Sequence, residues 1–550
     1  MGTAQDPTVS RVELTEEQKH ENEALAKIVK TQGFVDDIID GIYLAVIAIS
    51  LVLIILFVAI SPNLPDFFPA FKVFYRIPAI LTALPQTITE LPKLAQNAYV
   101  HFPTDYAQFS ALSATFFALT AQYLTTIDYK SLIICFSWGA YIWDAYLDIR
   151  QRDMLHEIYR PAAIRPLVTR KAFLEANAYG LDKSSLKMLQ SLVEQIKTTL
   201  VLVYDVLPYI WYSTGDFMLA RLGLGPEYEI THSIIFFIFT TLLSTITTIP
   251  FDLYGTFIVE AKHGFNKQTI SLFFSDMLKT LALTFSLGSL VLSGLLWTIK
   301  KTGSNFYYYV MVFMMCVQFI GFTIFPTWIQ PLFNKFDVLE DGELKTAIEA
   351  LATRVNYPLK KLYVVDGSKR SGHSNAYMYG FFKNKRIVLF DTLIKQTNTQ
   401  EVCAILAHEL GHWKHNHVLK MLFASQVQIF VIFYMFSLVI TQSKMYTDFG
   451  FSTMPVFIGF MFYQYLYVPI DTIVTFFFNR LSRKNEFEAD AFSKKLGYQE
   501  ELKQGLIKIH IENKGNLNPD KVYSAYHYSH PPLVERLAAL SDPNVAPKSD

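Results

Sequence analysis

A series of long apolar stretches constrains this chain more than any other feature. A helix needs about 20 predominantly apolar residues to cross a bilayer. Of the 550 residues, 51% are hydrophobic and only 17% are charged, whereas a soluble domain carries about 25% charged residues. The predicted membrane helices are residues 42–60, 132–147, 198–212, 233–249, 278–299, 306–328, 419–441 and 451–478, with 107–124 as a weaker candidate. The chain is therefore predicted to be a polytopic membrane protein.

Basic residues mark one side of the predicted membrane region as cytosolic. Lysine and arginine collect in the cytosolic loops of membrane proteins. Here the richest loops are residues 148–197, 250–279, 329–418 and 479–550. The loops of the opposite side hold little more than Arg221, Lys300, Lys301 and Lys444. The large polar segment 329–418 is therefore predicted to face the cytosol.

Charge balance and cysteine content exclude several other classes of protein. The chain has 48 basic and 48 acidic residues, so nothing indicates nucleic-acid binding, and no obligate protein partner is evident. Cys135, Cys316 and Cys403 all lie in apolar segments, which predicts neither a disulfide framework nor a cysteine metal site. The polar first 40 residues lack the early apolar core of a cleavable signal peptide and are expected to form a flexible tail.

The segment 329–418 reads as a small α+β unit. Residues 343–355 have the pattern of a short helix. Residues 362–366, 374–380 and 386–391 read as strands, and the last two are predicted to form a hairpin through 383–385.

The run His408-Glu409-Leu410-Gly411-His412 matches the H-E-x-x-H pattern of zinc peptidases. It lies in an apolar stretch, residues 402–418, that is predicted to be helical. Residues four apart share one helix face, so both imidazoles can reach a single Zn²⁺. Glu409 then lies beside the metal, where it can take a proton from water. Because so short a pattern also occurs by chance, the rest of such a site has to be sought elsewhere in the chain.

Two acidic residues are candidates for completing the site. A zinc enzyme needs at least three protein ligands. One class of zinc peptidase uses a histidine six residues after the second, but this chain has Val418 there. Another class uses a glutamate of a later helix, and here Glu486 and Asp490 share one helix face. Glu486 could ligate zinc while Asp490 accepts the N–H of a ligand histidine. In the alternative interpretation, both carboxylates lie on a solvated helix face.

Further polar residues near the motif and near the C-terminus have open roles. His415 is interpreted as a surface residue or a neighbour of the ligands rather than a ligand. His417 is expected to point elsewhere and to meet the membrane interface. In the cluster 526–537, His530 could donate to an oxyanion and Arg536 could orient a carboxylate. A turn followed by a capped surface helix would explain this cluster equally well.

Several long motifs, taken together, resemble one known family. They are residues 250–254 (PFDLY), 260–269 (EAKHGFNKQT), 331–336 (PLFNKF), 373–380 (HSNAYMYG), 408–412 (HELGH), the tract 486–490 and the cluster 526–537. Their order is that of the type I CaaX prenyl proteases, the integral-membrane zinc endopeptidases that process farnesylated proteins. The resemblance covers roughly residues 141–540, and so many motifs in one order make it specific.

The resemblance implies an all-α polytopic fold, a seven-helix transmembrane barrel around a large water-filled chamber. A small cytosolic α+β zinc-metalloprotease insert and an extra N-terminal membrane segment would complete it. The expected parts are residues 1–40 (polar tail), 41–130 (extension with one span), 131–328 (five helices), 329–418 (insert ending in the H-E-x-x-H helix), 419–480 (two helices) and 481–550 (helical region with the third ligand). The topology of the N-terminal extension stays open, since it depends on whether residues 107–124 also span.

The resemblance also implies roles for individual residues. His408, His412 and Glu486 would bind one Zn²⁺, with Glu409 as general base and Asp490 hydrogen-bonded to a ligand histidine. His530 and Arg536 would border the reacting carbonyl. Asn375, Ala376 and Tyr377 would pair with the substrate backbone by β-augmentation, and Asn266 would lie near the metal.

The implied activity is removal of the aaX tripeptide from prenylated CaaX proteins. Some relatives also cut upstream of the prenyl-cysteine. The expected partners are prenylated protein or peptide substrates and membrane lipid, and the expected location is the endoplasmic reticulum membrane, with the inner nuclear membrane as a further site. Two other functions fit parts of the pattern. One is a membrane quality-control zinc protease that does not need a prenyl group. The other is a transporter or channel whose intramembrane ionisable residues line a pore.

Overall fold

The computed structural model describes residues 128–380 and 385–541. The predicted N-terminal tail and the predicted spans 42–60 and 107–124 lie outside the described residues.

The long helices of the membrane region are α5 (Tyr129–Leu155), α6 (Arg170–Val203), α7 (Val206–Leu222), α8 (Glu229–Tyr254), α9 (Ile270–Leu283), α10 (Ser289–Thr302), α11 (Phe306–Ile324), α15 (His417–Val439) and α17 (Val456–Lys495). Short π-helical segments continue α8, α9 and α11 as η2 (Gly255–Glu260), η3 (Thr284–Gly288) and η5 (Phe325–Ile329).

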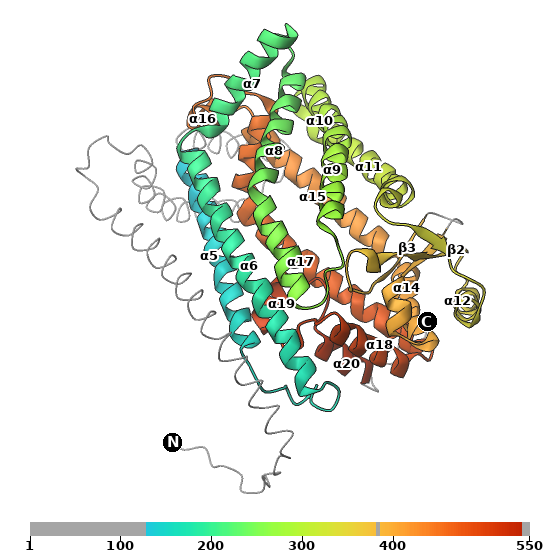
Figure 1. Cartoon of the computed structure of the whole chain (residues 1–550). Helices are drawn as coiled ribbons and strands as arrows, with labels where there is room; N and C mark the ends of the chain where they lie inside the picture. The colour runs from blue at the N-terminus through green and yellow to red at the C-terminus, as the bar shows by residue number, and fades with distance from the viewer. Residues whose placement is uncertain (1–127, 381–384, 542–550) are drawn as a thin grey trace, which may run out of the picture. The chain divides into compact units, whose positions relative to one another are not determined.

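The membrane helices pack side by side in a closed sequence of neighbours (Figure 1). Helix α5 packs on α6, which packs on η2 at the end of α8; α8 packs on α10 and α10 on α11. Helix α11 packs on α15, α15 on α17, and α17 returns to α5. Each helix therefore meets its neighbours along narrow strips, and only 6% of the most apolar window of the run Glu229–Glu260 is buried within the described chain. Large apolar side chains on the outside, such as Leu290 and Phe423, are exposed, as expected for contact with lipid.

Five of the described helical segments are long and apolar enough to cross a membrane. They are Tyr129–Leu155, Glu229–Glu260, Ile270–Leu332, His417–Val439 and Val456–Lys495. The third of these turns back at Gly303, whose φ of 67° lies in the left-handed region, so α10 and α11 pack against each other. The prediction of a mostly helical, multi-pass membrane protein is confirmed, while the expected number of seven spans stays a prediction.

The predicted span 198–212 is wrong as a continuous helix. Helix α6 ends at Val203, and α7 begins only at Val206. Between them Asp205 has a φ of 52°, a left-handed conformation that an α-helix cannot include. The side chain of Lys130 in α5 contacts the Asp205 carboxylate at 2.6 Å and ties this corner to the ring of helices. Hydropathy alone could not reveal this break, because apolar residues lie on both sides of it.

The insert between α11 and α15 contains a four-stranded sheet. Its strands are β1 (Phe336–Val338), β2 (Leu359–Val365), β3 (Ala376–Tyr379) and β4 (Lys385–Phe390), in the order β1-β2-β4-β3. The antiparallel pairing of β3 with β4 agrees with the predicted hairpin, and β2 runs parallel to β4. Strand β1, which was not predicted, adds an antiparallel edge to β2. The predicted helix 343–355 is α12 (Glu343–Arg354).

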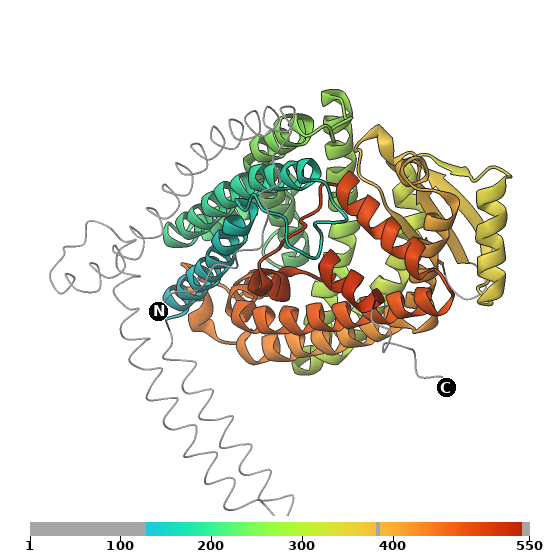
Figure 2. The same ribbon diagram turned by 90° about the horizontal axis from the view of Figure 1, so that it is seen from below.

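Helix α14 (Thr399–Lys414) is the centre of this insert. It begins with a capping box in which Asn398 and Glu401 satisfy each other's backbone N–H groups. It packs against α12, the edge strand β3, α17 and α18 (Gln499–Glu512) (Figures 1 and 2). The predicted helix 402–418 is interrupted, because Asn416 takes a left-handed φ of 56° and α15 starts at His417. Two short helices, α19 (Lys521–His527) and α20 (Leu533–Ser541), complete the C-terminal region.

The core around α14 yields a stability prediction. Leu406 of α14 is fully buried in the apolar core that this helix shares with the sheet and α12. Leu406→Ala should therefore lower the free energy of unfolding by about 2–5 kcal/mol. Thermal unfolding in detergent measures this as a lower midpoint. Val338→Ala, on a side chain that is 56% exposed, is the control. Equal midpoints for the two variants would contradict the assignment of Leu406 to the core.

Candidate metal centre

A close approach between α14 and α17 creates the candidate centre. Gly411 of α14 faces Ala489 of α17, and a Cβ atom added at Gly411 would lie 2.9 Å from the Cα of Ala489. Ala489 is itself fully buried. The hydroxyl of Ser493, one turn further along α17, donates to the Ala404 carbonyl of α14 at 3.0 Å. The absence of side-chain bulk between the two helices lets the polar groups of one reach those of the other.

Three side chains from these helices converge on one point. His408 and His412 of α14 and Glu486 of α17 each offer a ligand atom, and the three atoms lie within 4.8 Å of one another. The two Nε2 atoms are 3.1 Å apart. The Glu486 carboxylate lies 3.5 Å from Nε2 of His408 and 3.3 Å from Nε2 of His412. Zinc bonds of about 2.0–2.1 Å in a tetrahedron place ligand atoms roughly 3.3 Å apart, so these separations fit such an ion.

The orientation of His408 is fixed from behind. Asp490 accepts the Nδ1–H of His408 at 2.8 Å, which leaves the lone pair on Nε2 directed toward His412 and Glu486. Arg536 of α20 donates to both Asp490 oxygens, at 2.9 and 2.6 Å. The side chains of Asp490 and Arg536 are almost completely buried. The carboxylate is therefore held rigidly, and with it the imidazole plane.

The local charge favours a cation at this point. Burial disfavours the charged form of His408, but the hydrogen bond with Asp490 and the nearby Glu486 carboxylate outweigh burial and raise the pKa of this imidazole to about 9. In addition, Oε2 of Glu486 is buried without a hydrogen-bond partner among the described residues. A buried carboxylate oxygen without a partner is costly. A metal ion held by His408, His412 and Glu486 would supply the missing interaction.

His412 has a different set of neighbours from His408. Its Nδ1 lies 2.9 Å from Nδ1 of His417, and Nε2 of His417 lies 3.0 Å from the Glu488 carboxylate. The expectation that His417 points away to the membrane interface is therefore wrong. The turn at Asn416 brings His417 back over the end of α14. His415 is exposed and stacks on His417, with ring centroids 5.6 Å apart.

Two candidate catalytic groups stand beside the three ligands. Glu409 follows His408 on α14 and is partly exposed; within residues 128–380 and 385–541 we find no hydrogen-bond partner for its carboxylate. His530 lies in the loop before α20, its side chain is 66% exposed, and its Nε2 is 3.4 Å from Glu486. Nδ1 of His530 lies 3.0 Å from the Ser529 hydroxyl, and both side chains are exposed enough to meet a bound molecule.

Arg536 lies beside two carboxylates of α17. Its guanidinium is buried against Asp490, and Nη1 lies 3.6 Å from Glu486. This agrees with the prediction that Arg536 orients a carboxylate, while its implied place at the border of a reacting carbonyl stays a prediction.

The strand predicted to bind substrate lies at an edge of the sheet. Within the described part of the chain, β3 pairs with β4 only, so its other edge has unpaired backbone groups. Ala376 and Tyr377 are in this strand. Asn375 precedes it, and its side chain accepts the N–H of Ala376 at 2.8 Å. Strand β3 also packs against α14, the helix that carries His408 and His412.

A polar junction joins the loop before β3 to the membrane helices. The Tyr179 hydroxyl of α6 donates to Glu260 of η2 at 2.5 Å, and His373 lies 3.5 Å from the same carboxylate. Phe265 stacks on the His373 ring, with centroids 4.0 Å apart. Asn266 forms an isolated antiparallel bridge with Ser371 in this junction. The structure thus shows Asn266 in the support of β3; among the described residues we find no contact between it and the three candidate ligands.

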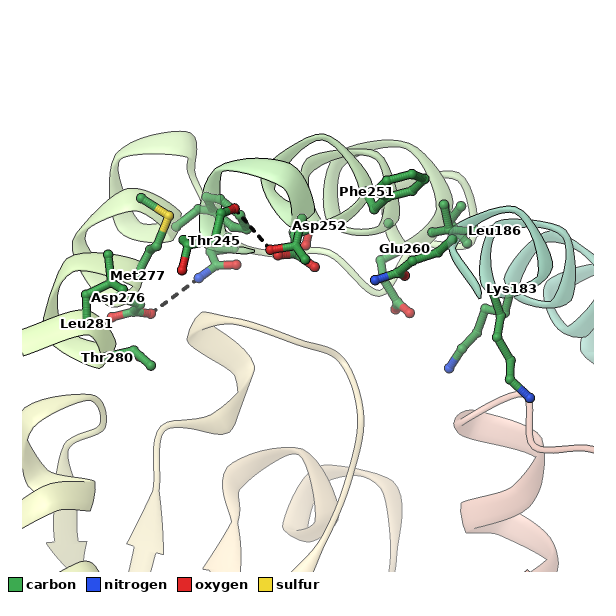
Figure 3. A pocket seen from close by; sticks show the side chains of 18 residues that line it. Lys183, Leu186, Thr245, Phe251, Asp252, Glu260, Asp276, Met277, Thr280 and Leu281 are labelled. Carbon is green, nitrogen blue, oxygen red and sulfur yellow. Dashed lines mark hydrogen bonds between the residues drawn. The ribbon is translucent and has the colours of Figure 1, made fainter. Parts of the chain in front are cut away.

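A cavity of about 710 Å³ lies between α6, α8 with η2, and α9 (Figure 3). Its lining combines apolar side chains such as Phe251 and Met277 with the charged groups of Lys183, Asp252, Glu260 and Asp276. Figure 3 shows these carboxylates on the helices that face the cavity. Charged side chains within apolar helices are costly unless they are paired or hydrated. The cavity therefore combines apolar and charged surface, and the expected water-filled chamber stays a prediction.

This fold and this site define a membrane-embedded metallopeptidase, with a candidate metal centre on an H-E-x-x-H helix and a glutamate of a later helix. Comparison with known families agrees. A family model described as CAAX prenyl protease N-terminal, five membrane helices, matches residues 149–335, and the model of Peptidase family M48 matches residues 338–544.

Similar proteins cover most of this chain. The CAAX prenyl protease 1 homolog of Arabidopsis thaliana is 44% identical over 415 residues, which is 75% of this chain and 98% of that protein. The homolog of Homo sapiens is 39% identical over 448 residues, 74% of this chain and 94% of that protein. The crystal structure of S. mikatae Ste24p aligns with a TM-score of 0.73 at 38% identity, over 76% of this chain and all of that one. The chain therefore belongs to peptidase family M48 as a metalloprotease of the CAAX prenyl protease type, which confirms the resemblance found in the sequence.

The contact between α14 and α17 yields a prediction about the metal. Gly411→Ala places a Cβ against the Ala489 backbone, so the helices must separate and the three ligands must move apart. We expect loss of metal content after dialysis and a lower unfolding midpoint. Gly139→Ala in α5, where an added Cβ meets nothing within 4 Å, is the matched control and should keep both properties. A Gly411→Ala protein with full metal content would show that the close approach is not required.

Proposed function

We propose that this protein is a zinc endopeptidase that removes the aaX tripeptide from prenylated CaaX proteins, with upstream cleavage of the same substrates as a further activity. The observation that carries the proposal is the convergence of His408, His412 and Glu486 beside the free carboxylate of Glu409 and the open edge of β3. Relatives named CAAX prenyl protease 1 support the substrate class.

The donor set favours zinc as the metal. Two imidazoles and one carboxylate are the ligands of many catalytic zinc sites, which keep one position open for water or substrate. No cysteine takes part among the described residues, and Cys403 of α14 is buried in the core of the insert. When bound, zinc acts as a Lewis acid toward the scissile carbonyl and lets water lose a proton near neutral pH.

The protein's own groups carry the remaining chemistry. Glu409 takes a proton from the attacking water and later delivers it to the leaving amine. His530 donates a hydrogen bond to the oxygen of the scissile carbonyl as negative charge develops there. Asp490 and Arg536 keep His408 in the tautomer and orientation that ligation needs. None of these roles requires a large movement of α14 or α17, since both helices are already in contact.

The free edge of β3 offers the substrate backbone a register. An extended peptide that pairs with Asn375, Ala376 and Tyr377 would form main-chain hydrogen bonds without regard to most of its side chains. Such pairing places successive residues at a fixed spacing along the edge of the sheet. The polar junction of Tyr179, Glu260 and His373 would hold this strand in place relative to the membrane helices.

The mixed apolar and charged cavity and the membrane ring fit a lipid-modified substrate. The peptide end of a CaaX protein needs a polar space, whereas its prenyl chain needs apolar surroundings. Helices with both kinds of surface surround the cavity. We further propose that the protein resides in the endoplasmic reticulum membrane with the metal centre on the cytosolic side, which agrees with the distribution of basic residues.

Replacing the general base should separate catalysis from metal binding. Glu409→Gln is expected to keep one zinc per chain but to lose hydrolysis of a farnesylated CaaX peptide, because the ligands are untouched and the base is gone. An unprenylated peptide of the same sequence is the matched substrate control. Equal cleavage of both peptides by the wild-type protein would favour a quality-control protease, and no cleavage by zinc-loaded protein would favour the transporter interpretation.

His530 yields a second catalytic prediction. His530→Gln should lower kcat about 10²–10³-fold, as loss of an oxyanion donor does. Metal content should be unchanged, because the side chain is largely exposed. His527→Gln, on a histidine that does not contact the metal group among the described residues, should leave kcat within about twofold of wild type. Loss of zinc in His530→Gln would indicate a role in metal binding instead.

A further inference from the structure

The second ligand histidine is oriented by a chain of hydrogen bonds that differs from the one behind His408. We propose that His417 and Glu488 are positioning residues that fix His412 in the tautomer required for metal binding. This inference rests on the proposed metal centre and adds a second support to it, on the side of the centre away from Asp490 and Arg536.

The proposal starts from the direction of each proton. The Glu488 carboxylate can only accept a hydrogen bond when ionised, and it lies 3.0 Å from Nε2 of His417. Lys484 and Lys420 lie 3.7 and 3.9 Å from this carboxylate and favour its ionised form. His417 therefore donates from Nε2 to Glu488.

This donation determines the direction of the hydrogen bond between His417 and His412 and, with it, the tautomer of His412. A neutral imidazole has one N–H, so Nδ1 of His417 is an acceptor. It lies 2.9 Å from Nδ1 of His412, which must therefore donate. His412 then has its lone pair on Nε2, the atom that faces His408 and Glu486. Reversal of any link would place a proton on Nε2 of His412, where the metal has to bind.

Burial makes the arrangement specific. The side chain of His417 is only 3% exposed, and both of its ring nitrogens have a partner. The turn at Asn416 is needed for this placement, since an uninterrupted helix would direct a residue five positions after His412 to another face. Glu488 itself is 32% exposed and extends from α17, two residues after Glu486. The same helix thus supplies a ligand, the acceptor for His408 and the end of the chain to His412.

The arrangement predicts which substitutions are tolerated at position 417. In His417→Gln, the side-chain amide can donate to Glu488 while its oxygen accepts from His412, so both hydrogen bonds survive. His417→Leu keeps a similar volume but offers neither bond. Lys414→Leu, on an exposed residue of the same turn whose only side-chain contact among the described residues is with Trp413, is the matched control.

The test is zinc retention by the purified full-length protein in detergent. Zinc release to a chelator is timed for the wild-type protein and the three variants, and the unfolding midpoint is measured for the metal-stripped forms. We expect His417→Leu to release zinc about 10–100-fold faster, with a metal-stripped midpoint close to that of His417→Gln. His417→Gln and Lys414→Leu should release zinc within a few-fold of wild type, and KM for a farnesylated peptide should change little.

Glu488→Leu provides a second test of the proposal, because Glu488 is partly exposed and its replacement leaves the core unchanged. It should also speed zinc release, and combining it with His417→Leu should add little further, as expected for members of one chain. The positioning role would be overturned if His417→Leu released zinc at the wild-type rate, or if His417→Gln and His417→Leu released zinc equally fast. Either result would leave the metal centre intact. A wild-type protein that binds no zinc would contradict the metal centre and, with it, this proposal.

Discussion

The contact between the backbones of α14 and α17 at Gly411 is the constraint on which the site depends. The two helices are separated in the chain by α15 and the short helix α16 (Ser443–Thr447). Their ligands meet only because Gly411 and Ala489 add almost no bulk between the helix axes. Substantial side chains in this contact would leave His408 and Glu486 too far apart to share an ion. A small residue within the motif thus determines where the charged residues can act.

The membrane ring and the insert are joined by polar contacts rather than by a continuous apolar core. Arg370, just before the loop that leads to β3, forms a two-pronged ion pair with Asp276 of α9, at 2.7 and 3.0 Å. The Tyr179–Glu260–His373 junction provides a second connection, and Asn513 after α18 accepts the backbone N–H of Ser374 at 3.0 Å. Three separate parts of the chain therefore contact the segment that precedes β3. The strand proposed to bind substrate and the candidate metal centre are consequently held by the same set of contacts.

Sequence patterns predicted the helices and strands of this protein better than the breaks and turns between them. The H-E-x-x-H spacing and the pairing of Glu486 with Asp490 reflect helix periodicity, which is local, so the residues that converge could be proposed in advance. The α12 helix and the β3–β4 hairpin followed from local patterns for the same reason. The roles proposed for these residues in catalysis still await the experiments above.

Features that depend on single backbone conformations could not be predicted. The break at Asp205 and the turn at Asn416 each require one residue with positive φ, and neither residue is a glycine that would signal it. The turn at Asn416 reverses the expected direction of His417. Strand β1 is only three residues long and forms through its partner β2, which local patterns do not reveal. Arg536 was separated from its partner Asp490 by a long stretch of chain, so its burial behind that carboxylate emerged only from the fold.

X-ray absorption at the zinc edge of the purified protein tests the central claim most directly. One zinc per chain is expected, with only nitrogen and oxygen neighbours at about 2.0–2.1 Å and the scattering pattern of two imidazoles. One imidazole should disappear from the spectrum of His412→Gln in whatever fraction of zinc remains bound. A sulfur neighbour at about 2.3 Å, or an unchanged spectrum in that variant, would contradict a metal centre built from α14 and α17.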